Sequence, residues 1–197
     1  MNNGKEYVKI KVVLLGDTGV GKSSIAQRLV TKKFPNEMQS TIGASFFVHT
    51  THKNGKLLKY EIWDTAGQER YKSIIPIYIR NAHVILITHD LSHPQTINSV
   101  ENYWLPSIRS YIDMHEDTLV YVIGNKLDKL EKDPYTMIDT NLDINLYNVS
   151  AKTGHNIEEL FTELSEKMSE KEIDDPLNNY YSLDTIDSKT SGLCCGE

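Results

Sequence analysis

The stretch from Gly16 to Ser23 has the residue types and spacing of a phosphate-binding loop. It reads GDTGVGKS, fits the pattern G-x-x-x-x-G-K-[ST], and lies between a strand-like run and a helical run. Glycines let such a loop point backbone N–H groups at phosphate oxygens, next to a helix N-terminus. Lys22 is expected to reach the β- and γ-phosphates, and the Ser23 hydroxyl to bind Mg²⁺. The pattern predicts phosphate binding without identifying the base.

Two later stretches predict that the base is guanine. GNKLD, from Gly124 to Asp128, follows an apolar run and belongs at the carboxyl edge of a sheet, where open α/β sheets bind ligands. The Asp128 carboxylate is suited to the N1–H and exocyclic amine of guanine, and adenine has no such pair of donors. SAKTG offers the Ala151 N–H to guanine O6 and Lys152 to the ring. GNKLD alone fits a solvated turn equally well, but the three motifs in this order favour a guanine nucleotide.

Two turn-rich segments are candidates for sensing the γ-phosphate. In WDTAGQE, Asp64 is a partner of Mg²⁺ through water, Gly67 offers an N–H to the phosphate, and Gln68 is placed to orient an attacking water. In FPNEMQSTIG, the Thr41 hydroxyl completes the Mg²⁺ shell and Phe34 packs edge-on against the base. Both segments would lose these contacts when the γ-phosphate is hydrolysed, as in a switch between ordered and disordered states. The alternative for Asp64 is a helix cap.

The complete predicted site combines these motifs. Its nucleotide-binding residues are Asp17, Thr18, Gly19, Val20, Gly21, Lys22, Ser23, Ser24, Phe34, Thr41, Asp64, Gly67, Asn125, Lys126, Asp128, Ser150, Ala151 and Lys152. The predicted Mg²⁺ ligands are Ser23, Thr41 and, through water, Asp64. The predicted catalytic residues are Gln68 and Lys22.

The hydrophobic pattern predicts the elements that position these motifs. Strands are expected over Tyr7–Leu15, on both sides of Asn54-Gly55 between Ser45 and Asp64, over Ala82–Asp90 and over Thr118–Asn125. Helices are expected over Lys22–Lys33, Pro94–Met114 and Asn156–Glu172. Pro106 should bend or interrupt the second helix. Near-continuous apolar strands alternating with helices predict a doubly wound α/β domain.

Two regions depart from this regular alternation. The segment between Asn125 and Ser150 contains Pro134 and helix-poor residues, so a shortened helix or a loop is expected there. From Asp174 onward the sequence is polar and aperiodic, which predicts a disordered tail.

The composition fits one intracellular domain. A chain of 197 residues is long enough to bury its own core, and a net charge of −6 argues against a nucleic-acid partner. The N-terminal apolar run is too short for a signal peptide or a membrane span, so the cytosol is the expected compartment. The two cysteines, Cys194 and Cys195, are adjacent near the carboxyl end. Alone they fit a redox pair, a metal pair or chance, and CCGE is a poor C-a-a-X box.

From about Lys5 to Lys171 the chain resembles the Rab proteins of the Ras superfamily of small GTPases. GDTGVGKSS, TIGASF, WDTAGQERYKSI and GNKLD occur in order and at near-standard spacing. IGASF and RYKSI separate Rab proteins from Ras, Rho and Arf relatives, and STIGASF with YKSIIPIYIR is most similar to the early-endosomal branch. The resemblance implies a P-loop small GTPase fold: a six-stranded, mostly parallel sheet with helices on both faces. It also implies a GTP-binding domain over residues 5–173 and a hypervariable tail over 174–197.

The resemblance further implies a membrane-anchored switch in vesicle and endosomal trafficking. Its GTP-bound state would recruit effectors through Ile42, Phe46, Trp63 and Tyr78. Cys194 and Cys195 match a site for two geranylgeranyl groups, which together give stable anchoring. Implied partners also include an exchange factor, a GTPase-activating protein, a prenyl transferase escort and a GDP-dissociation inhibitor. The implied location is the cytoplasmic face of intracellular membranes, with endosomes favoured, in exchange with the cytosol.

The implied reaction is slow, Mg²⁺-dependent hydrolysis of GTP to GDP and phosphate. Two other classes remain open: a nucleotide-binding interaction protein with negligible hydrolysis, and a P-loop ATPase or kinase. Gln68 and Thr41 argue against the first, and NKLD with SAK against the second. The chain departs from the Rab pattern at Ile79 and Asn81, where an aromatic residue and a glycine are usual, and at His89, where a tyrosine is expected. His89 is interpreted as a structural substitution.

Overall fold

The strands and helices lie close to their expected positions. The computed structural model describes residues 7–34, 40–67, 74–115, 117–131 and 144–171. The strands are β1 (Tyr7–Leu15), β2 (Ala44–Lys53), β3 (Lys56–Thr65), β4 (Val84–Asp90), β5 (Leu119–Asn125) and β6 (Asn145–Asn148). The helices are α1 (Lys22–Thr31), α2 (Ile75–Ile79), α3 (Gln95–Ser99), α4 (Leu105–Met114) and α5 (Ile157–Glu170), with a π-helical turn over Val100–Trp104 and a 3-10 turn over Leu127–Lys129.

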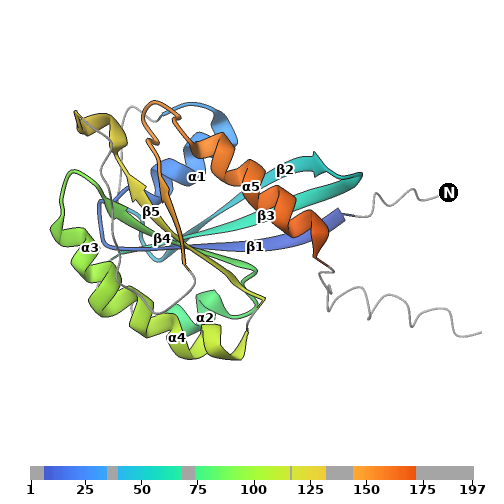
Figure 1. The fold of residues 1–197 in the computed structure, drawn as a ribbon, viewed down its shortest axis with the longest axis horizontal. Coiled ribbons are helices and arrows are strands. Elements are labelled where there is room, and N and C mark those ends of the chain that lie inside the picture. The colour runs from blue at the N-terminus through green and yellow to red at the C-terminus, as the bar shows by residue number, and fades with distance from the viewer. Residues whose placement is uncertain (1–6, 35–39, 68–73, 116, 132–143, 172–197) are drawn as a thin grey trace, which may run out of the picture.

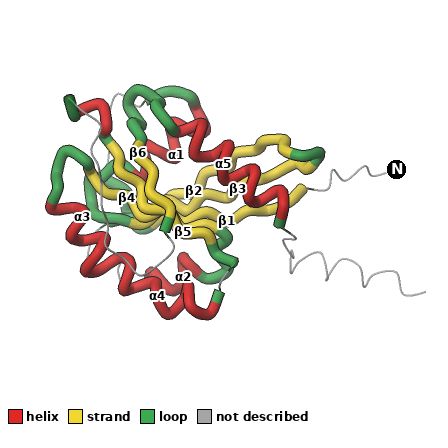
Figure 2. Tube along the Cα trace, viewed as in Figure 1, coloured by secondary structure: helices red, strands yellow, loops and turns green. Residues whose placement is uncertain are grey.

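The strands form one six-stranded sheet in the order β2-β3-β1-β4-β5-β6. β2 runs antiparallel to β3, and the other neighbouring pairs are parallel. Figure 1 shows α1 and α5 on one side of the sheet and α2, α3 and α4 on the other, and Figure 2 shows the same layers coloured by type. This confirms the doubly wound, mostly parallel sheet with helices on both faces.

Two apolar cores hold the helices against the sheet. One joins α1 and α5 to residues such as Ile10, Tyr60 and Leu86. The other joins α2, the π-helical turn and α4 to residues such as Val13 and Ile87. Because β1, β4 and β5 are parallel, their carboxyl ends meet at one edge of the sheet, and the predicted binding motifs follow them there.

The β2–β3 hairpin confirms the turn predicted at Asn54-Gly55. Both residues have positive φ, 49° and 77°, as a two-residue hairpin turn with this sequence requires. The register runs from Lys53 opposite Lys56 to Ala44 opposite Thr65. At the open end, Ala66 donates its N–H to the Gly43 carbonyl at 2.8 Å. The two candidate γ-phosphate segments therefore leave the hairpin from the same end.

The predicted interruption at Pro106 takes the form of a π-helical turn. α3, this turn and α4 follow one another from residue 95 to 114, and Pro106 lies in the first turn of α4. Proline has no N–H to donate four residues back, and its ring crowds that carbonyl. A widened turn just before the proline accommodates both effects without ending the helix.

Asn81 explains one departure from the Rab pattern. Its φ is 57°, in the left-handed region that glycine adopts most readily. Asparagine tolerates this conformation better than most other residues. The usual glycine is therefore replaced here without a change of backbone geometry.

Several sequence predictions lie outside the described residues. They include Gln68, most of the segment between Asn125 and Ser150, the tail from Asp174, and the cysteine pair Cys194 and Cys195. No helix in the described part of the chain combines the length and apolar character needed to cross a bilayer.

His89 lies in β4 and is only 3% exposed, in keeping with a structural role. Its Nδ1 atom has no hydrogen-bond partner. Burial lowers the pKa of His89 from 6.5 to about 4, although the nearby Asp90 charge opposes this shift. The folded protein therefore keeps this imidazole neutral at a pH where the unfolded chain already protonates it.

We expect His89 to make the fold sensitive to mild acid. Because the folded pKa is below the unfolded one, stability is retained above pH 6.5 and falls as the pH drops toward 4. The full loss is about 3 kcal/mol. Urea unfolding of wild type and His89→Phe across this range measures it, since phenylalanine does not titrate. The free energy of unfolding should fall less steeply with decreasing pH in His89→Phe than in wild type. The same replacement at exposed His52 should leave this pH dependence unchanged. Equal pH dependence in all three proteins would contradict the assignment.

Candidate nucleotide site

The phosphate-binding loop joins β1 to α1 and is closed by Lys22. The Lys22 Nζ atom donates to the carbonyls of Gly16 and Asp17, both at 2.8 Å. Burial lowers the pKa of Lys22 to about 8, and the charges of Asp64 and Asp17 oppose the shift. The loop thus holds a largely buried cation at the N-terminus of α1, where an anion is favoured.

Two glycines allow other segments to lie directly on this loop. Gly21 has a φ of 100°, and a Cβ atom there would lie 2.2 Å from the Asn125 side chain. A Cβ on Gly67 would lie 2.4 Å from the backbone of Asp17 and Thr18. Any larger residue at either position would separate the loop from the segment that contacts it.

Three oxygen-bearing side chains meet beside the loop. The Ser23 hydroxyl donates to Asp64 Oδ2 at 2.5 Å and lies 2.8 Å from the Thr41 hydroxyl. Thr41 also donates to Asp64 Oδ2 at 3.3 Å. Asp64 is fully buried, and its second oxygen, Oδ1, has no partner. The structure therefore brings together the three predicted Mg²⁺ ligands, with one buried carboxylate oxygen unsatisfied.

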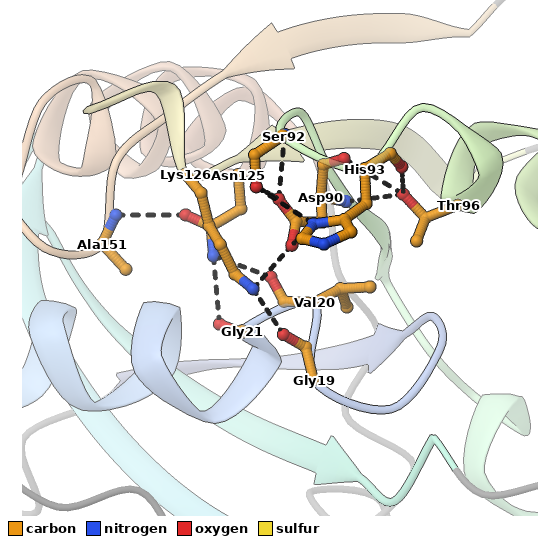
Figure 3. A network of polar contacts seen from close by, with 10 residues as sticks. All are labelled: Gly19, Val20, Gly21, Asp90, Ser92, His93, Thr96, Asn125, Lys126 and Ala151. Carbon is orange, nitrogen blue, oxygen red and sulfur yellow. Dashed lines mark hydrogen bonds and ion pairs between the residues drawn. The ribbon is translucent and has the colours of Figure 1, made fainter. Parts of the chain in front are cut away.

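Asn125 joins the phosphate-binding loop to the SAK motif (Figure 3). Its Nδ2 atom donates to the Val20 carbonyl at 2.9 Å, and its Oδ1 atom accepts the Ala151 N–H at 3.1 Å. Asn125 is only 1% exposed, so both bonds are shielded from water. The Ala151 N–H, predicted to serve guanine O6, is directed at Asn125 in this structure.

Lys126 lies along the phosphate-binding loop. It has a φ of 67°, and its Nζ atom donates to the Gly19 carbonyl at 2.7 Å. The same ammonium is 2.7 Å from Asp90 Oδ2. Figure 3 shows this lysine reaching between the loop and Asp90.

Asp128 is oriented by the SAK motif. Its Oδ1 atom accepts the Ser150 hydroxyl at 2.6 Å, and its Oδ2 atom lies 4.0 Å from Lys152 Nζ. Ser150 also accepts the Thr153 N–H, so one buried hydroxyl fixes both the carboxylate and the turn. One oxygen of the carboxylate is therefore fixed by Ser150, and the other lies beside Lys152.

A cavity of about 390 Å³ lies between these groups. The predicted residues that line it are Thr18, Gly19, Gly21, Lys22, Ser23, Ser24, Phe34, Thr41, Gly67, Asn125, Lys126, Asp128, Ala151 and Lys152. The other predicted residues do not line the cavity, but each is hydrogen-bonded to a neighbouring part of the site: Asp17, Val20, Asp64 and Ser150. Its remaining lining residues are Ser40, Thr65 and Lys129, which the motifs did not indicate.

Three further residues hold the site and were not predicted. Asp90 accepts Lys126, the Ser92 hydroxyl and N–H, and His93. Trp104 donates its indole N–H to Asp17 at 2.8 Å, and Arg28 donates to the carbonyls of Ala151 and Lys152. Asp90 ends a strand beside the predicted motifs, which was an available signal. Trp104 and Arg28 come from helices, and their contacts depend on the tertiary fold.

The predicted effector residues include three rings in sequence along the surface. Phe46 and Trp63 have centroids 5.5 Å apart, and Trp63 and Tyr78 have centroids 6.3 Å apart. Phe46 is 51% exposed and Ile42 is 83% exposed. Trp63 and Tyr78 also pack on the core beneath α2 and α4. The rings form one continuous aromatic cluster rather than three isolated packing residues.

The comparisons with known proteins agree on one family. A sequence model of the Ras family matches residues 11–170. The chain is 34% identical to the GTP-binding protein YPT52 of Saccharomyces cerevisiae, covering 87% of this chain and 86% of that protein. It is 38% identical to the Ras-related protein Rab-5B of Plasmodium falciparum, covering 81% and 78%. It is 35% identical to the human Ras-related protein Rab-22A, covering 95% and 98%.

Asp90 gives a testable prediction about the site. Burial raises its pKa, but hydrogen bonds from Lys126 and Ser92 outweigh this and hold the pKa at about 2. Asp90→Asn removes the charge that fixes Lys126, so labelled guanine nucleotide should dissociate about tenfold faster. Release can be followed by fluorescence during a chase with unlabelled nucleotide. Asp113→Asn, at an exposed position of α4, is the matched control; equal rates in both variants would exclude a positioning role for Asp90.

Proposed function

Because this chain belongs to the Ras family and is a Rab-like GTPase of vesicle trafficking, we propose a specific role for it. It acts as a GTP-hydrolysing switch at endosomal membranes. The observation that carries this proposal is the convergence of three groups on one cavity. A phosphate-binding loop, a cluster of oxygen ligands and a base-reading edge all line or support it. Each of the three matches one part of Mg²⁺–GTP.

Guanine selectivity is assigned to Asp128, with Asn125, Lys126 and the SAK motif as its supports. Ser150 already satisfies one oxygen of the Asp128 carboxylate. The carboxylate is therefore oriented for the paired donors of guanine, and adenine would leave it poorly satisfied. Lys126 and Lys152 would lie against the base, and Phe34, at the cavity wall, would contact its edge.

Ser23, Thr41 and Asp64 are the proposed Mg²⁺ ligands. Hydroxyl and carboxylate oxygens suit a hard cation, and the unpartnered Oδ1 atom of buried Asp64 suits a bound water. When bound, Mg²⁺ would neutralise charge on the β- and γ-phosphates. Among the described residues, no three histidine, cysteine or carboxylate side chains cluster in a metal-binding arrangement. The site therefore suits a cation whose shell is completed by phosphate and water.

Hydrolysis is proposed to follow in-line attack of water on the γ-phosphate. Lys22 holds its charge at the loop, where it stabilises phosphate oxygens. Gln68, outside the described residues, would orient the water, next to Gly67 at the loop backbone. The described cavity lining contains no arginine, so a GTPase-activating protein is proposed to supply one and to accelerate an otherwise slow reaction by roughly 10⁵-fold.

The switch output is proposed to be effector binding at the aromatic cluster. Thr41 and Gly67 belong to the segments that leave the β2–β3 hairpin, whose strands carry Phe46 and Trp63. Loss of the γ-phosphate would release these segments and alter the surface beside the rings. Effectors, an exchange factor and an activating protein are the partners expected of the family.

The tail is proposed to attach a GTP-binding domain of residues 5–173 to membranes. Cys194 and Cys195 would each carry a geranylgeranyl group, and two such lipids give anchoring that one does not. The segment 174–197 contains one lysine and several acidic residues, so it adds little attraction to anionic lipid. A prenyl transferase escort and a GDP-dissociation inhibitor would shield the lipids during exchange with the cytosol.

Phosphate release separates the proposed enzyme from a nucleotide-binding protein without hydrolysis. We expect wild type to release phosphate slowly from GTP in single-turnover assays, and Gln68→Leu to be at least about tenfold slower while binding GTP equally well. Excess ATP should not compete, because Asp128 discriminates against adenine. Equal rates for wild type and Gln68→Leu would refute the role of Gln68, and efficient competition by ATP would refute the guanine assignment.

If the two cysteines carry the membrane anchor, their loss should change where the protein is found without changing its affinity for nucleotide. Cys194→Ser with Cys195→Ser should shift the protein from the membrane to the supernatant fraction of a cell lysate. GDP affinity should not change, since the described cavity lies in the folded domain. The single variants should show intermediate membrane attachment, because each keeps one lipid site. Persistent membrane binding of the double variant would rule out lipid anchoring at these cysteines.

A further inference from the structure

One arginine of α1 holds the backbone of the turn that carries the SAK motif. This turn runs from Ser150 to Gly154 and is here called the SAK turn. The Arg28 Nε atom donates to the Ala151 carbonyl at 2.7 Å, and its Nη2 atom donates to the Lys152 carbonyl. A Cβ atom on Gly154 would lie 3.8 Å from the Arg28 side chain, so the turn passes close around it. Two successive carbonyls of the SAK turn therefore face α1.

The Arg28 guanidinium is also fixed by its own helix. Its Nη1 atom donates to the Lys32 carbonyl at 2.9 Å, and the Lys32 N–H donates to the Arg28 carbonyl at 2.9 Å. Lys32 ends α1 with a φ of 60°, a left-handed conformation that is common at helix ends. Arginine presents its donors as a rigid planar fork, so these bonds leave the side chain little freedom. Because all of them are made within the protein, the fork costs no further ordering when a base binds.

The hydrogen bonds of the SAK turn leave one backbone donor without an acceptor. Three of four consecutive N–H groups are bonded within the protein, those of Ala151, Thr153 and Gly154. The fourth, that of Lys152, has no acceptor among the described residues. The peptide group that contains it has its carbonyl on Arg28, and the carbonyl and N–H of a trans peptide point in opposite directions. Arg28 therefore directs the Lys152 N–H away from α1.

The SAK turn lies between Arg28 and the nucleotide cavity. Ala151 and Lys152 both line this cavity, and Arg28 does not. The turn is joined to the Asp128 carboxylate by the Ser150 hydroxyl at 2.6 Å. In guanine the O6 acceptor is next to the N1–H that Asp128 is proposed to bind. A donor from the SAK turn is thus placed on the side of the carboxylate where O6 would lie.

We propose that Arg28 is a positioning residue for guanine recognition. It holds the peptide group between Ala151 and Lys152 so that the N–H of this group is available to guanine O6. The Ala151 N–H already donates to Asn125, so the neighbouring N–H is the donor with free capacity. This inference rests on the proposed binding of guanine nucleotide and identifies a residue that sets its selectivity. Adenine has an amino group in place of O6, so a fixed N–H there would face another donor.

A purely structural role for Arg28 predicts a different pattern of affinities. If Arg28 only braces α1 against the SAK turn, its loss should weaken all purine nucleotides by the same factor. If it positions the donor for O6, its loss should weaken only nucleotides that carry an accepting oxygen there. Arg28→Met is a suitable change because it keeps an apolar stem of similar length and removes the fork.

Affinities of the full-length proteins for three diphosphates separate the two roles. The probes are GDP, 6-thio-GDP, in which a weakly accepting sulfur replaces O6, and inosine diphosphate, which keeps O6 but lacks the exocyclic amine. Displacement of a fluorescent GDP analogue measures each affinity. We expect wild type to prefer GDP over 6-thio-GDP by about tenfold, the effect of about one hydrogen bond. In Arg28→Met this preference should fall to about twofold or less.

The preference for GDP over inosine diphosphate provides an internal control. It depends on the Asp128 carboxylate and should be the same in wild type and Arg28→Met. Arg109→Met makes the same chemical change at an exposed position of α4 and should keep both wild-type preferences. Arg28→Lys is the second variant in case Arg28→Met does not fold. It should also lose preference for GDP over 6-thio-GDP, though less, because one ammonium cannot hold two carbonyls as the fork does.

The remaining outcomes distinguish this inference from the proposed function. An equal loss of affinity for GDP and 6-thio-GDP in the Arg28 variants would show a structural brace and overturn the inference. A collapse of both preferences together would show that the whole base site has loosened, and would overturn it as well. A wild type that does not distinguish GDP from 6-thio-GDP would exclude an O6 donor in the SAK turn, with the same consequence. Failure of wild type to bind GDP, or efficient displacement of GDP by ATP, would instead refute the proposed guanine nucleotide switch.

Discussion

The Asn125 side chain is the contact on which the nucleotide site depends. One amide group bonds the phosphate-binding loop at Val20 and the SAK motif at Ala151, and both bonds are buried. An asparagine is suited to this because it offers a donor and an acceptor on one rigid plane. Removing either bond would leave a buried polar group unsatisfied. One residue at the end of β5 therefore joins the loop that follows β1 directly to the SAK motif.

Around this contact, two lysines are held by hydrogen bonds to the phosphate-binding loop. Lys22 is held by loop carbonyls near Asp64, and Lys126 is held between Gly19 and Asp90. Each lysine is thereby fixed before any phosphate or base arrives, which reduces the entropy lost on binding. The two apolar cores keep the strand ends in place, so that the loops carrying these charges have a rigid base. The Ras family relationship is consistent with this division between a packed sheet and a polar edge.

Much of the fold and site was predictable because the signals were local. A short local sequence pattern is enough to predict each of several features. These are the strands from Tyr7 and Ala82, the turn at Asn54-Gly55 and the loop at Gly16. An interruption of the helix near Pro106 was predictable, but its π-helical form was not. The local geometry that a helix adopts around a proline depends on the residues that pack against it. Asp90 and Trp104 were missed because their roles arise from contacts between distant segments. The hydroxyl-to-carboxylate cluster at Ser23 was predicted from the motifs, yet the bonds among its members required three segments to fold together.

The β2–β3 hairpin has a mechanical consequence. Its register is fixed along ten pairs, and slipping that register by one residue would turn every side chain to the wrong face. The hairpin is therefore held in one register, and it is joined to the rest of the sheet through the pairing of β3 with β1. Both candidate γ-phosphate segments leave the hairpin at the same end, where Ala66 donates to the Gly43 carbonyl. A displacement of one segment would therefore act on the other through this hydrogen bond, and the two would change position together rather than separately.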